Sequence, residues 1–356
     1  MKPYICGKLP VEYKIDKDML KLISEANVKY GEYKSLLNTL EFDSKFFLDS
    51  VLLNESYKST QIEGTQISQD EMYYLKYMEK TDDNKEIQNL KNTIEYAYNK
   101  IDSGINFALV NEMHRIILDS VRGAQKTPGQ IRTTQNWIGS RGVGIDGATF
   151  VPPAPEDVYE LLMNLYEYMN DEFIDPIFVN IAISHAQFET IHAYKDGNGR
   201  LGRALIPVQM ALLDNEKPIL YMSEILELYK PSYQRFLMES RRGNISGFIK
   251  FFLQCVIDQC NNYIYKIQRI KQIYREDMEK IKSIRGSSVY RVMPIIMRQI
   301  VFTKKEVTDE LDISEGTVSN IINQLVEIGI IIRDNTVMKK GYRYQSIYEV
   351  FVGGDV

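Results

Sequence analysis

Cysteine, histidine and tryptophan are scarce in this chain of 356 residues, which holds 3 cysteines, 3 histidines and 1 tryptophan. Cys6, Cys255 and Cys260 show no CxxC spacing, which excludes a site built on that motif. So low a cysteine content indicates reduced thiols, as in a cytoplasmic protein.

Long apolar runs are also missing. No run approaches the roughly 20 residues that span a bilayer, and residues 1–8 lack the apolar region of a signal peptide. A net charge of −5 gives no overall attraction to nucleic acid. We therefore expect a cytoplasmic protein that does not enter a membrane.

The residues that are present indicate a mainly α-helical globular protein. Hydrophobic residues make up 44% of the chain and charged residues 26%, and the length suffices for two or three domains. Apolar residues recur with helical spacing along most of the chain. We expect three parts: a helical region over 1–100, a catalytic core with its following helices over 101–284, and a smaller domain over 285–356.

The segment from His192 to Arg203, HAYKDGNGRLGR, is predicted to join two helices. Asp175 and Pro176 can serve as the N-cap and first residue of an apolar helix that reaches residue 191. Helical spacing resumes from Leu201 onwards. A loop and a helix N-terminus therefore follow directly on His192.

Glycines and arginines in this loop predict an anion site. Gly197 and Gly199 allow backbone N–H groups to converge, and the following helix points its positive end at the same place. Arg200 and Arg203 project from one side of the first turn and can grip phosphate oxygens.

Two further residues add chemistry to the anion site. Asp196 is a hard oxygen ligand of the kind that holds Mg²⁺ beside substrate phosphates, and His192 can accept a proton near neutral pH. The alternative is a glycine turn beside a solvated charge run, which is typical of a lone Asp-Gly or Asn-Gly. The whole string favours a triphosphate site.

At these residues the chain resembles the Fic family, whose signature is HxFx(D/E)GNGRxxR, usually with proline after the histidine. Every functional position matches. The departures are Ala193 for the usual proline and Tyr194 for the usual phenylalanine. A buried tyrosine needs a polar partner for its hydroxyl.

The resemblance implies a Fic-type helical core with a β-hairpin flap, and transfer of AMP from ATP to a Ser, Thr or Tyr hydroxyl of a protein, with the chain itself as one candidate target. By position, His192 is the general base and Asp196 the Mg²⁺ ligand. Tyr233 stands where relatives often place an adenine-side aromatic, although core packing is an equal alternative. The phosphate-binding positions are Gly197, Asn198, Gly199, Arg200, Gly202 and Arg203.

A second match lies far upstream, where Ser59, Glu63 and Gly64 fit the family's inhibitory pattern (S/T)xxxE(G/N). The resemblance implies that Glu63 pairs with Arg203 and takes the place of the γ-phosphate, as in the class with an N-terminal inhibitory helix. In relatives this glutamate also supports removal of AMP from the target. The alternative is an ordinary helix C-terminus capped by glycine.

Residues 128–153 look like the family's flap, which lies over the site and pairs with the backbone of the target. The segment contains Pro128–Arg132, Trp137 and Phe150–Pro153, and four glycines that favour mobility and strand addition. The alternative is a surface loop with one buried tryptophan. Outside the signature, we interpret His114 and His185 as structural residues.

The C-terminal part changes character after residues 285–288. Three helices, the second capped by Thr303, are expected to precede two strands over 330–333 and 342–350. This order resembles a winged helix-turn-helix.

Whether that part binds DNA is left open by the sequence. The expected recognition helix, 314–328, has no Lys or Arg. Its Asn320 and Asn323 could read bases, and Lys339, Lys340 and Arg343 form the main basic cluster. A protein-interaction or dimer module is an equal alternative, and the family often forms homodimers. The competing function is a DNA-binding transcriptional regulator whose Fic-like domain senses nucleotide.

Overall fold

The computed structural model describes residues 2–65, 67–79, 81–121, 123–139, 142, 144–336 and 340–353. Within these residues the chain is mainly helical, as predicted, with one small antiparallel sheet. It forms two compact units. The first comprises Met1–Tyr30, Glu55–Gln66 and Thr81–Cys260, and the second comprises Gly31–Asn54, Ile67–Lys80 and Asn261–Val356. The three-part division expected from the sequence stays a prediction.

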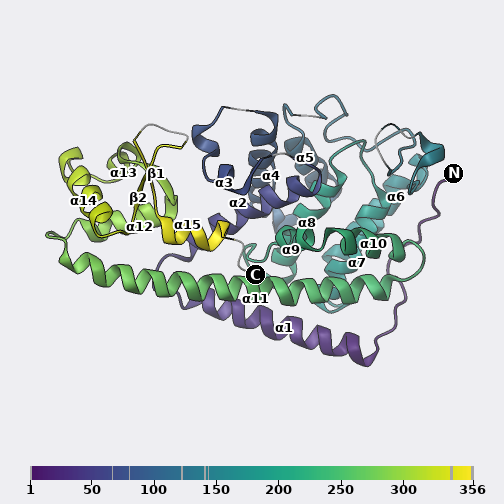
Figure 1. Ribbon diagram of the computed structural model, residues 1–356. Coiled ribbons are helices and arrows are strands. Elements are labelled where there is room, and N and C mark those ends of the chain that lie inside the picture. Colours follow the sequence, from purple (N-terminus) through teal and green to yellow (C-terminus); the bar gives the residue numbers. More distant parts are fainter. Residues whose placement is uncertain are drawn as a thin grey trace. The chain divides into compact units, whose positions relative to one another are not determined.

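The first unit is built around helix α8, which lies among four other helices (Figure 1). Helix α8 is buried over most of its length because its apolar residues face these neighbours. Since α8 begins at the end of the signature loop, this packing fixes the position of the candidate site. The five helices are α4 (Asp82–Tyr98), α5 (Phe107–Ile117), α6 (Val158–Asn170), α7 (Ile177–Ile191) and α8 (Asn198–Asp214).

Three long helices supply residues to both units: α1 (Lys17–Asn38), α2 (Ser44–Ile62) and α11 (Ile245–Lys280). Two shorter helices, α9 (Ser223–Leu228) and α10 (Lys230–Ser240), complete the first unit, and α3 (Gln69–Met72) belongs to the second. Among the described residues, no helix is long and apolar enough to cross a membrane.

Helix α7 begins one residue later than the sequence predicts. Pro176 has an extended ψ of 139° and is the N-cap, so the first helical residue is Ile177. The Asp175 carboxylate does not cap the helix. It accepts hydrogen bonds from the hydroxyls of Tyr13 and Tyr168, which hold the start of α7 against neighbouring chain segments.

The second unit contains a three-stranded antiparallel sheet of order β1–β3–β2. Phe302 pairs with Tyr342 across β1 and β3, and Arg333 pairs with Tyr342 across β2 and β3. Thr303 caps the helix that follows β1, as predicted, through a capping box with Glu306. The elements in order are α12 (Val289–Gln299), β1 (Val301–Thr303), α13 (Lys304–Glu310), α14 (Glu315–Glu327), β2 (Ile332–Asp334), β3 (Gly341–Arg343) and α15 (Gln345–Val352).

The predicted strand over residues 342–350 is wrong beyond residue 343, because residues 345–352 form helix α15. Ile347, Tyr348 and Phe351 are buried, and their spacing of one and three residues places them on one face of a helix. A short apolar run without clear alternation does not distinguish a strand from a helix.

Candidate functional site

His192 lies immediately after the last residue of α7, in a left-handed backbone conformation with φ 48° and ψ 57°. Its N–H continues the helix by donating to the Phe188 carbonyl at 3.1 Å. Its own carbonyl accepts from Arg132 Nε at 3.0 Å and from Asn136 Nδ2 at 3.1 Å. Hydrogen bonds from several directions thus fix the backbone of His192 at the start of the signature loop.

The imidazole of His192 is suited to accept a proton. Its Nδ1 atom is buried and has no hydrogen-bond partner among the described residues. Burial lowers the pKa of His192 to about 4, and the positive charge of Arg241 contributes to the same effect. The ring is therefore neutral at pH 7, which is the state that a general base requires.

Asn198 closes the signature loop on itself. Its Oδ1 accepts from the Tyr194 backbone N–H at 2.9 Å, and its Nδ2 donates to the Tyr194 carbonyl at 2.8 Å. Gly197, with φ +77°, occupies a left-handed conformation just before α8. The loop therefore presents the N-terminus of α8 in a defined geometry.

The Tyr194 departure from the family signature has a structural account. The hydroxyl of this buried tyrosine donates to Asn111 Oδ1 at 2.7 Å, and its ring stacks on His114 with 3.9 Å between centroids. His114 Nδ1 accepts from the Gly129 N–H, so its Nε2 carries the proton that is donated to the Asp196 carbonyl. Burial lowers the pKa of His114 to about 4. These contacts are those of a structural histidine.

Arg203 lies in the second turn of α8 with 2% of its side chain exposed. It donates from Nη2 to Glu63 Oε1 at 2.8 Å and to the Ser59 carbonyl at 2.9 Å, and from Nε to Ser59 Oγ at 2.8 Å. The structure thus brings the three residues together, although Ser59 and Glu63 are far from Arg203 in the sequence. Gly64, with φ +97°, directly follows the end of this segment.

Glu63 is held as a carboxylate. Burial alone would raise its pKa, but the charge and hydrogen bond of Arg203 outweigh burial and lower the pKa below the usual value. The Glu63 side chain nevertheless remains 44% exposed. A Cβ atom on Gly199 would stand 2.3 Å from Glu63 Oε1, so a side chain at 199 would displace the Glu63 carboxylate from this position.

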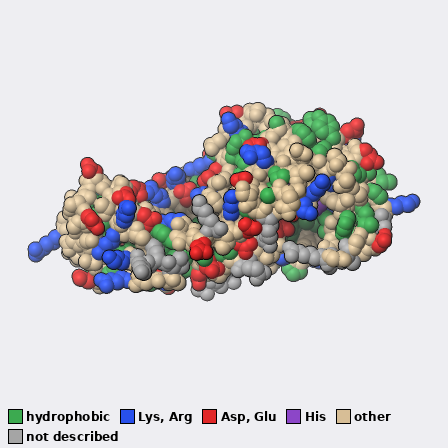
Figure 2. Space-filling model, turned by 90° about the horizontal axis from the view of Figure 1, so that it is seen from above, with side chains coloured by type: hydrophobic (Ala, Val, Ile, Leu, Met, Phe, Trp, Pro, Cys, Tyr) green, Lys and Arg blue, Asp and Glu red, His purple; other side chains and the backbone are tan. Residues whose placement is uncertain are grey.

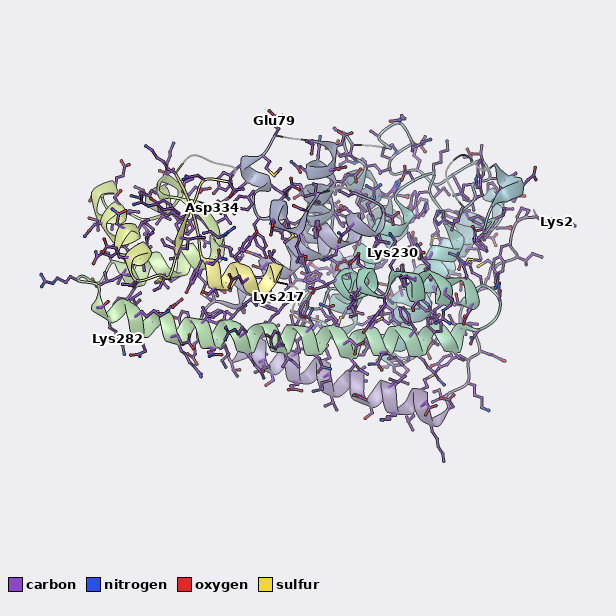
Figure 3. The ribbon with its side chains drawn as sticks, in the orientation of Figure 1. Lys2, Glu79, Lys217, Lys230, Lys282 and Asp334 are labelled. Atoms are coloured by element: carbon purple, nitrogen blue, oxygen red, sulfur yellow. The ribbon has the colours of Figure 1, made fainter. Side chains whose placement is uncertain are left out.

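The C-terminus of α2, just before Glu63, is held from α10. Lys230, in the first turn of that helix (Figure 3), donates from Nζ to the Ile62 carbonyl at 2.7 Å. A cation at a helix C-terminus is favourable because carbonyl groups there have no intrahelical partner.

Arg200 is paired with a carboxylate that the sequence does not single out. Its Nη1 lies 3.5 Å from Glu86 Oε2, and its Nη2 lies 3.4 Å from Asp196 Oδ1. The side chains of Arg200 and Glu86 are only 7% and 3% exposed. Glu86 also accepts from Thr65 Oγ1 at 3.3 Å. Helix α4 contributes Glu86 through a tertiary contact, which the spacing of residues in the sequence does not predict.

Arg200 retains hydrogen-bonding capacity despite its burial. Its Nε and Nη1 atoms have no hydrogen-bond partner among the described residues. Buried guanidinium donors normally find an acceptor, and an anion at the N-terminus of α8 would supply one.

Asp196 is the one candidate metal ligand in the loop. Its Oδ1 accepts from the Gly197 N–H at 2.6 Å, and its side chain is 43% exposed. Among the described residues there is no group of three or more His, Cys, Asp or Glu side chains that could enclose a metal ion. This donor set fits Mg²⁺, which often binds through one carboxylate together with substrate phosphates and water.

Tyr233 and His185 belong to the core. Tyr233 is 3% exposed, and its hydroxyl lies 2.8 Å from His185 Nε2. His185 Nδ1 lies 3.2 Å from the Gly202 carbonyl, and burial lowers the pKa of His185 to about 3. Gly202 is required by packing, because a Cβ there would meet Glu189 Oε1 at 2.4 Å. Core packing accounts for the burial of Tyr233, and its predicted adenine contact stays a prediction.

The expected β-hairpin flap is reduced to one antiparallel bridge between Ile138 and Phe150. Ile138 donates to the Phe150 carbonyl at 2.8 Å and accepts from the Phe150 N–H at 3.1 Å. Trp137 is 44% exposed, so the alternative of a buried tryptophan is wrong. Glycines Gly139, Gly142, Gly144 and Gly147 lie between the bridged residues, and residues 140, 141 and 143 are outside the described part of the chain.

Two family models match the chain, one over the residues that contain the candidate site and one over the segment before it. Residues 104–210 match the Fic/DOC family, and residues 20–99 match the Fic/DOC family N-terminal region. The chain is 31% identical over 143 residues to protein adenylyltransferase fic-1 of Caenorhabditis elegans, which covers 39% of this chain and 25% of the relative. It is 26% identical over 163 residues to protein adenylyltransferase Fic of Drosophila willistoni, covering 45% and 30%. The matches thus span a quarter to a third of these curated relatives.

Solved structures show the same fold. A Fic family protein from Desulfovibrio desulfuricans G20 superimposes with a TM-score of 0.58 at 19% identity, covering 94% of this chain and 97% of that one. Residues 134–508 of Fic-1 from C. elegans superimpose with a TM-score of 0.53 at 18% identity, covering 70% and 73%. The chain therefore carries a Fic/DOC domain preceded by the Fic/DOC N-terminal region.

Proposed function

We propose that this chain is a protein adenylyltransferase that moves AMP from ATP to a Ser, Thr or Tyr hydroxyl of a protein, with the chain itself as one candidate target. One observation carries the proposal. Two buried arginines, Arg200 and Arg203, stand in the first two turns of α8, and Arg200 keeps unsatisfied N–H donors. Together with the neutral His192 beside the loop, this arrangement suits a triphosphate and an attacking hydroxyl.

In the proposed reaction, His192 takes the proton of the target hydroxyl as its oxygen attacks the α-phosphorus of ATP. The bond from that phosphorus to the bridging oxygen breaks, and pyrophosphate leaves with the electron pair. Arg200, Arg203 and the N–H groups of Gly197 to Gly199 bind the phosphate oxygens. Asp196 would hold Mg²⁺, which would neutralise phosphate charge. Most of the rate then comes from positioning and charge stabilisation.

The proposed state is inhibited, because the Glu63 carboxylate occupies Arg203. A γ-phosphate would need the same Nη2 donor that reaches Glu63 at 2.8 Å. The exposed fraction of Glu63 leaves the side chain room to turn away once a nucleotide competes for Arg203. We include removal of AMP from a modified target as a second reaction of this site, in which Glu63 would take part.

The reaction type is tested by the position of the label. Purified protein with Glu63→Gly is incubated with Mg²⁺ and ATP labelled either at the α- or at the γ-phosphate, alone and with lysate proteins. Transfer of AMP predicts protein-bound label from α-labelled ATP alone. Label from the γ-position would indicate phosphoryl transfer, and the absence of both would refute transferase activity.

We propose that residues 289–352 form a winged helix. The proposal rests on the order of helices and strands in this segment. DNA binding is the weaker alternative. Arg343 donates to Gln345 and Tyr74 and lies 3.3 Å from Asp334 Oδ2, so its charge is already compensated. Lys339 lies outside the described residues. On the face drawn in Figure 2, basic side chains are interspersed with acidic ones.

A gel-shift experiment tests whether this segment binds DNA or serves as a protein-interaction or dimer module. The protein is incubated with mixed duplex DNA at low salt, and compared with a Lys339→Gln/Lys340→Gln variant. We expect no shift for either protein. A salt-sensitive shift that is lost in the variant would instead establish DNA binding.

A further inference from the structure

Arg241, at the C-terminal end of α10, contacts two separate parts of the candidate site. Its Nη2 donates to the Glu189 carbonyl at 2.9 Å, and its Nε reaches Thr190 Oγ1 at 3.4 Å. Its guanidinium carbon lies 4.2 Å from the centroid of the Phe150 ring. One side chain thus joins the last turn of α7 to the bridged residue of the flap.

The contact with α7 is of a kind that fixes a helix end. The last carbonyl groups of a helix have no intrahelical partner, and a cation there is favoured by the helix dipole. Arg132 acts on the same turn from another direction, with Nη2 donating to the Ile191 carbonyl at 3.3 Å and to the Pro153 carbonyl at 2.6 Å. His192 directly follows this turn, so both arginines limit where its backbone can lie.

The contact with Phe150 places a guanidinium over an aromatic ring in a mostly buried setting. The Arg241 side chain is largely removed from solvent, and burial lowers its pKa, while the nearby Glu189 carboxyl works against that effect. Glu189 itself is buried, and its Oε1 has no hydrogen-bond partner among the described residues. A guanidinium over an aromatic face gains electrostatic attraction, which grows when water is excluded. Phe150 is therefore tied to the same cation as the end of α7.

We propose that Arg241 is a positioning residue, which keeps His192 at the end of α7 in register with the bridged flap residue Phe150, where a target polypeptide would dock. This proposal rests on the proposed function in one respect, namely that the flap receives a target polypeptide. The mechanical link between flap and helix can be tested without any reaction. The hydrogen bonds of the Arg241 side chain go to α7 and to Met238 and not to the signature loop, so its effect should fall on turnover more than on ATP binding.

Trp137 makes the link measurable, because it is the single tryptophan of the chain and neighbours the bridged Ile138. Its fluorescence quenching by acrylamide reports access to the flap. Arg241→Gln is compared with Arg242→Gln, which removes the same charge from the adjacent, exposed position. Arg241→Lys tests partial rescue. Phe150→Leu removes the aromatic ring and leaves Arg241 in place. It provides a second test of the link if Arg241→Gln does not fold.

We expect Arg241→Gln to raise the Trp137 quenching constant about twofold, with Arg241→Lys in between and Arg242→Gln at the wild-type value. Phe150→Leu should also raise it. In the Glu63→Gly background, Arg241→Gln should lower the turnover of labelling about tenfold, since small displacements of a catalytic group cost that much or more, and leave the KM for ATP within about twofold. Equal quenching and equal turnover in Arg241→Gln and Arg242→Gln would overturn the proposal. If the Glu63→Gly parent labels nothing, the proposed function fails, while quenching still decides the link.

Discussion

The arginines of the Fic/DOC domain and those of residues 289–352 face their carboxylate partners in different surroundings. Arg203 and Arg200 are 2% and 7% exposed and each pairs with one internal glutamate, Glu63 or Glu86. Arg298, in the second region, is 43% exposed and pairs with Glu310. The first pairs are expensive to bury, whereas surface pairs contribute little in either direction.

This difference distinguishes arginines that are available to an anionic ligand from arginines that stabilise the fold. Arg200 keeps two buried nitrogen atoms without a hydrogen-bond partner. Arg343, in contrast, contacts Asp334, Gln345 and Tyr74, and also lies 4.5 Å from the ring of Tyr348. The Arg200 guanidinium thus remains able to bind an anion, while Arg343 already stabilises the sheet and α15.

The largest effect is expected from the base. His192→Ala in the Glu63→Gly background should lower the rate of AMP transfer about 10²- to 10⁴-fold, because the target hydroxyl loses its proton acceptor. The measurement is incorporation of α-labelled ATP. Mg²⁺-ATP binding by calorimetry should change little, and circular dichroism should report an intact fold. A variant with full transfer activity would remove His192 from the mechanism.

Exchanging one arginine in each region tests the comparison directly. Arg203→Gln in the Glu63→Gly background should weaken ATP binding about tenfold or more, since a hydrogen bond to a charged group contributes about 1.5–3 kcal/mol. Arg343→Gln should leave ATP affinity unchanged, because its contacts lie within the second unit. Calorimetric titration measures both. Equal losses in the two variants would contradict the distinction between the regions.

A smaller effect is expected at Glu86. Glu86→Gln removes the negative charge beside Arg200 while preserving a group that can bond to Thr65, so Mg²⁺-ATP should bind a few-fold more tightly, about threefold, as expected when a competing carboxylate is removed. Glu95→Gln, an exposed position on the same helix, is the matched control. Weaker binding in Glu86→Gln would show that Glu86 supports the phosphate site and does not compete with it.

The smallest effect concerns pH. The folded-state pKa of His192, about 4, lies below the ordinary histidine value of 6.5. The neutral base is therefore retained as pH falls through 6.5 and is lost only near 4. In Glu63→Gly, kcat/KM for transfer, which reports the free enzyme, should stay constant from pH 8 to about 5.5. A midpoint near 6.5 would mean that His192 is not shielded from water as the structure indicates.

The sequence predicts the parts of the site that local spacing defines. The loop, the start of α8 and the placement of both arginines follow from glycine positions and helical periodicity. The pairing of Glu63 with Arg203 follows from the family pattern alone. Glu86 and Arg241 could not be predicted, because each is a single charged residue in an ordinary helix or turn, and only tertiary packing brings it to the site.

One expected element is wrong, and two other features depend on tertiary packing. Residues 345–352 form a helix because their apolar positions share one helical face, a pattern that a short run leaves ambiguous. Tyr233 can be buried because His185 provides a partner for its hydroxyl, while its adenine contact stays a prediction. In the predicted flap, Ile138 and Phe150 form the one backbone bridge among the described residues, and a full β-hairpin there stays a prediction.

The restraint of Arg203 by Glu63 is the central claim, and one measurement tests it most directly. Wild-type protein, Glu63→Gly and the exposed control Glu79→Gly are incubated with Mg²⁺ and α-labelled ATP, and the initial rate of protein labelling is compared. Release of a charge-assisted contact predicts a rate at least about tenfold higher for Glu63→Gly, with Glu79→Gly equal to wild type. A Glu63→Gly rate equal to or below the wild-type rate would contradict the account.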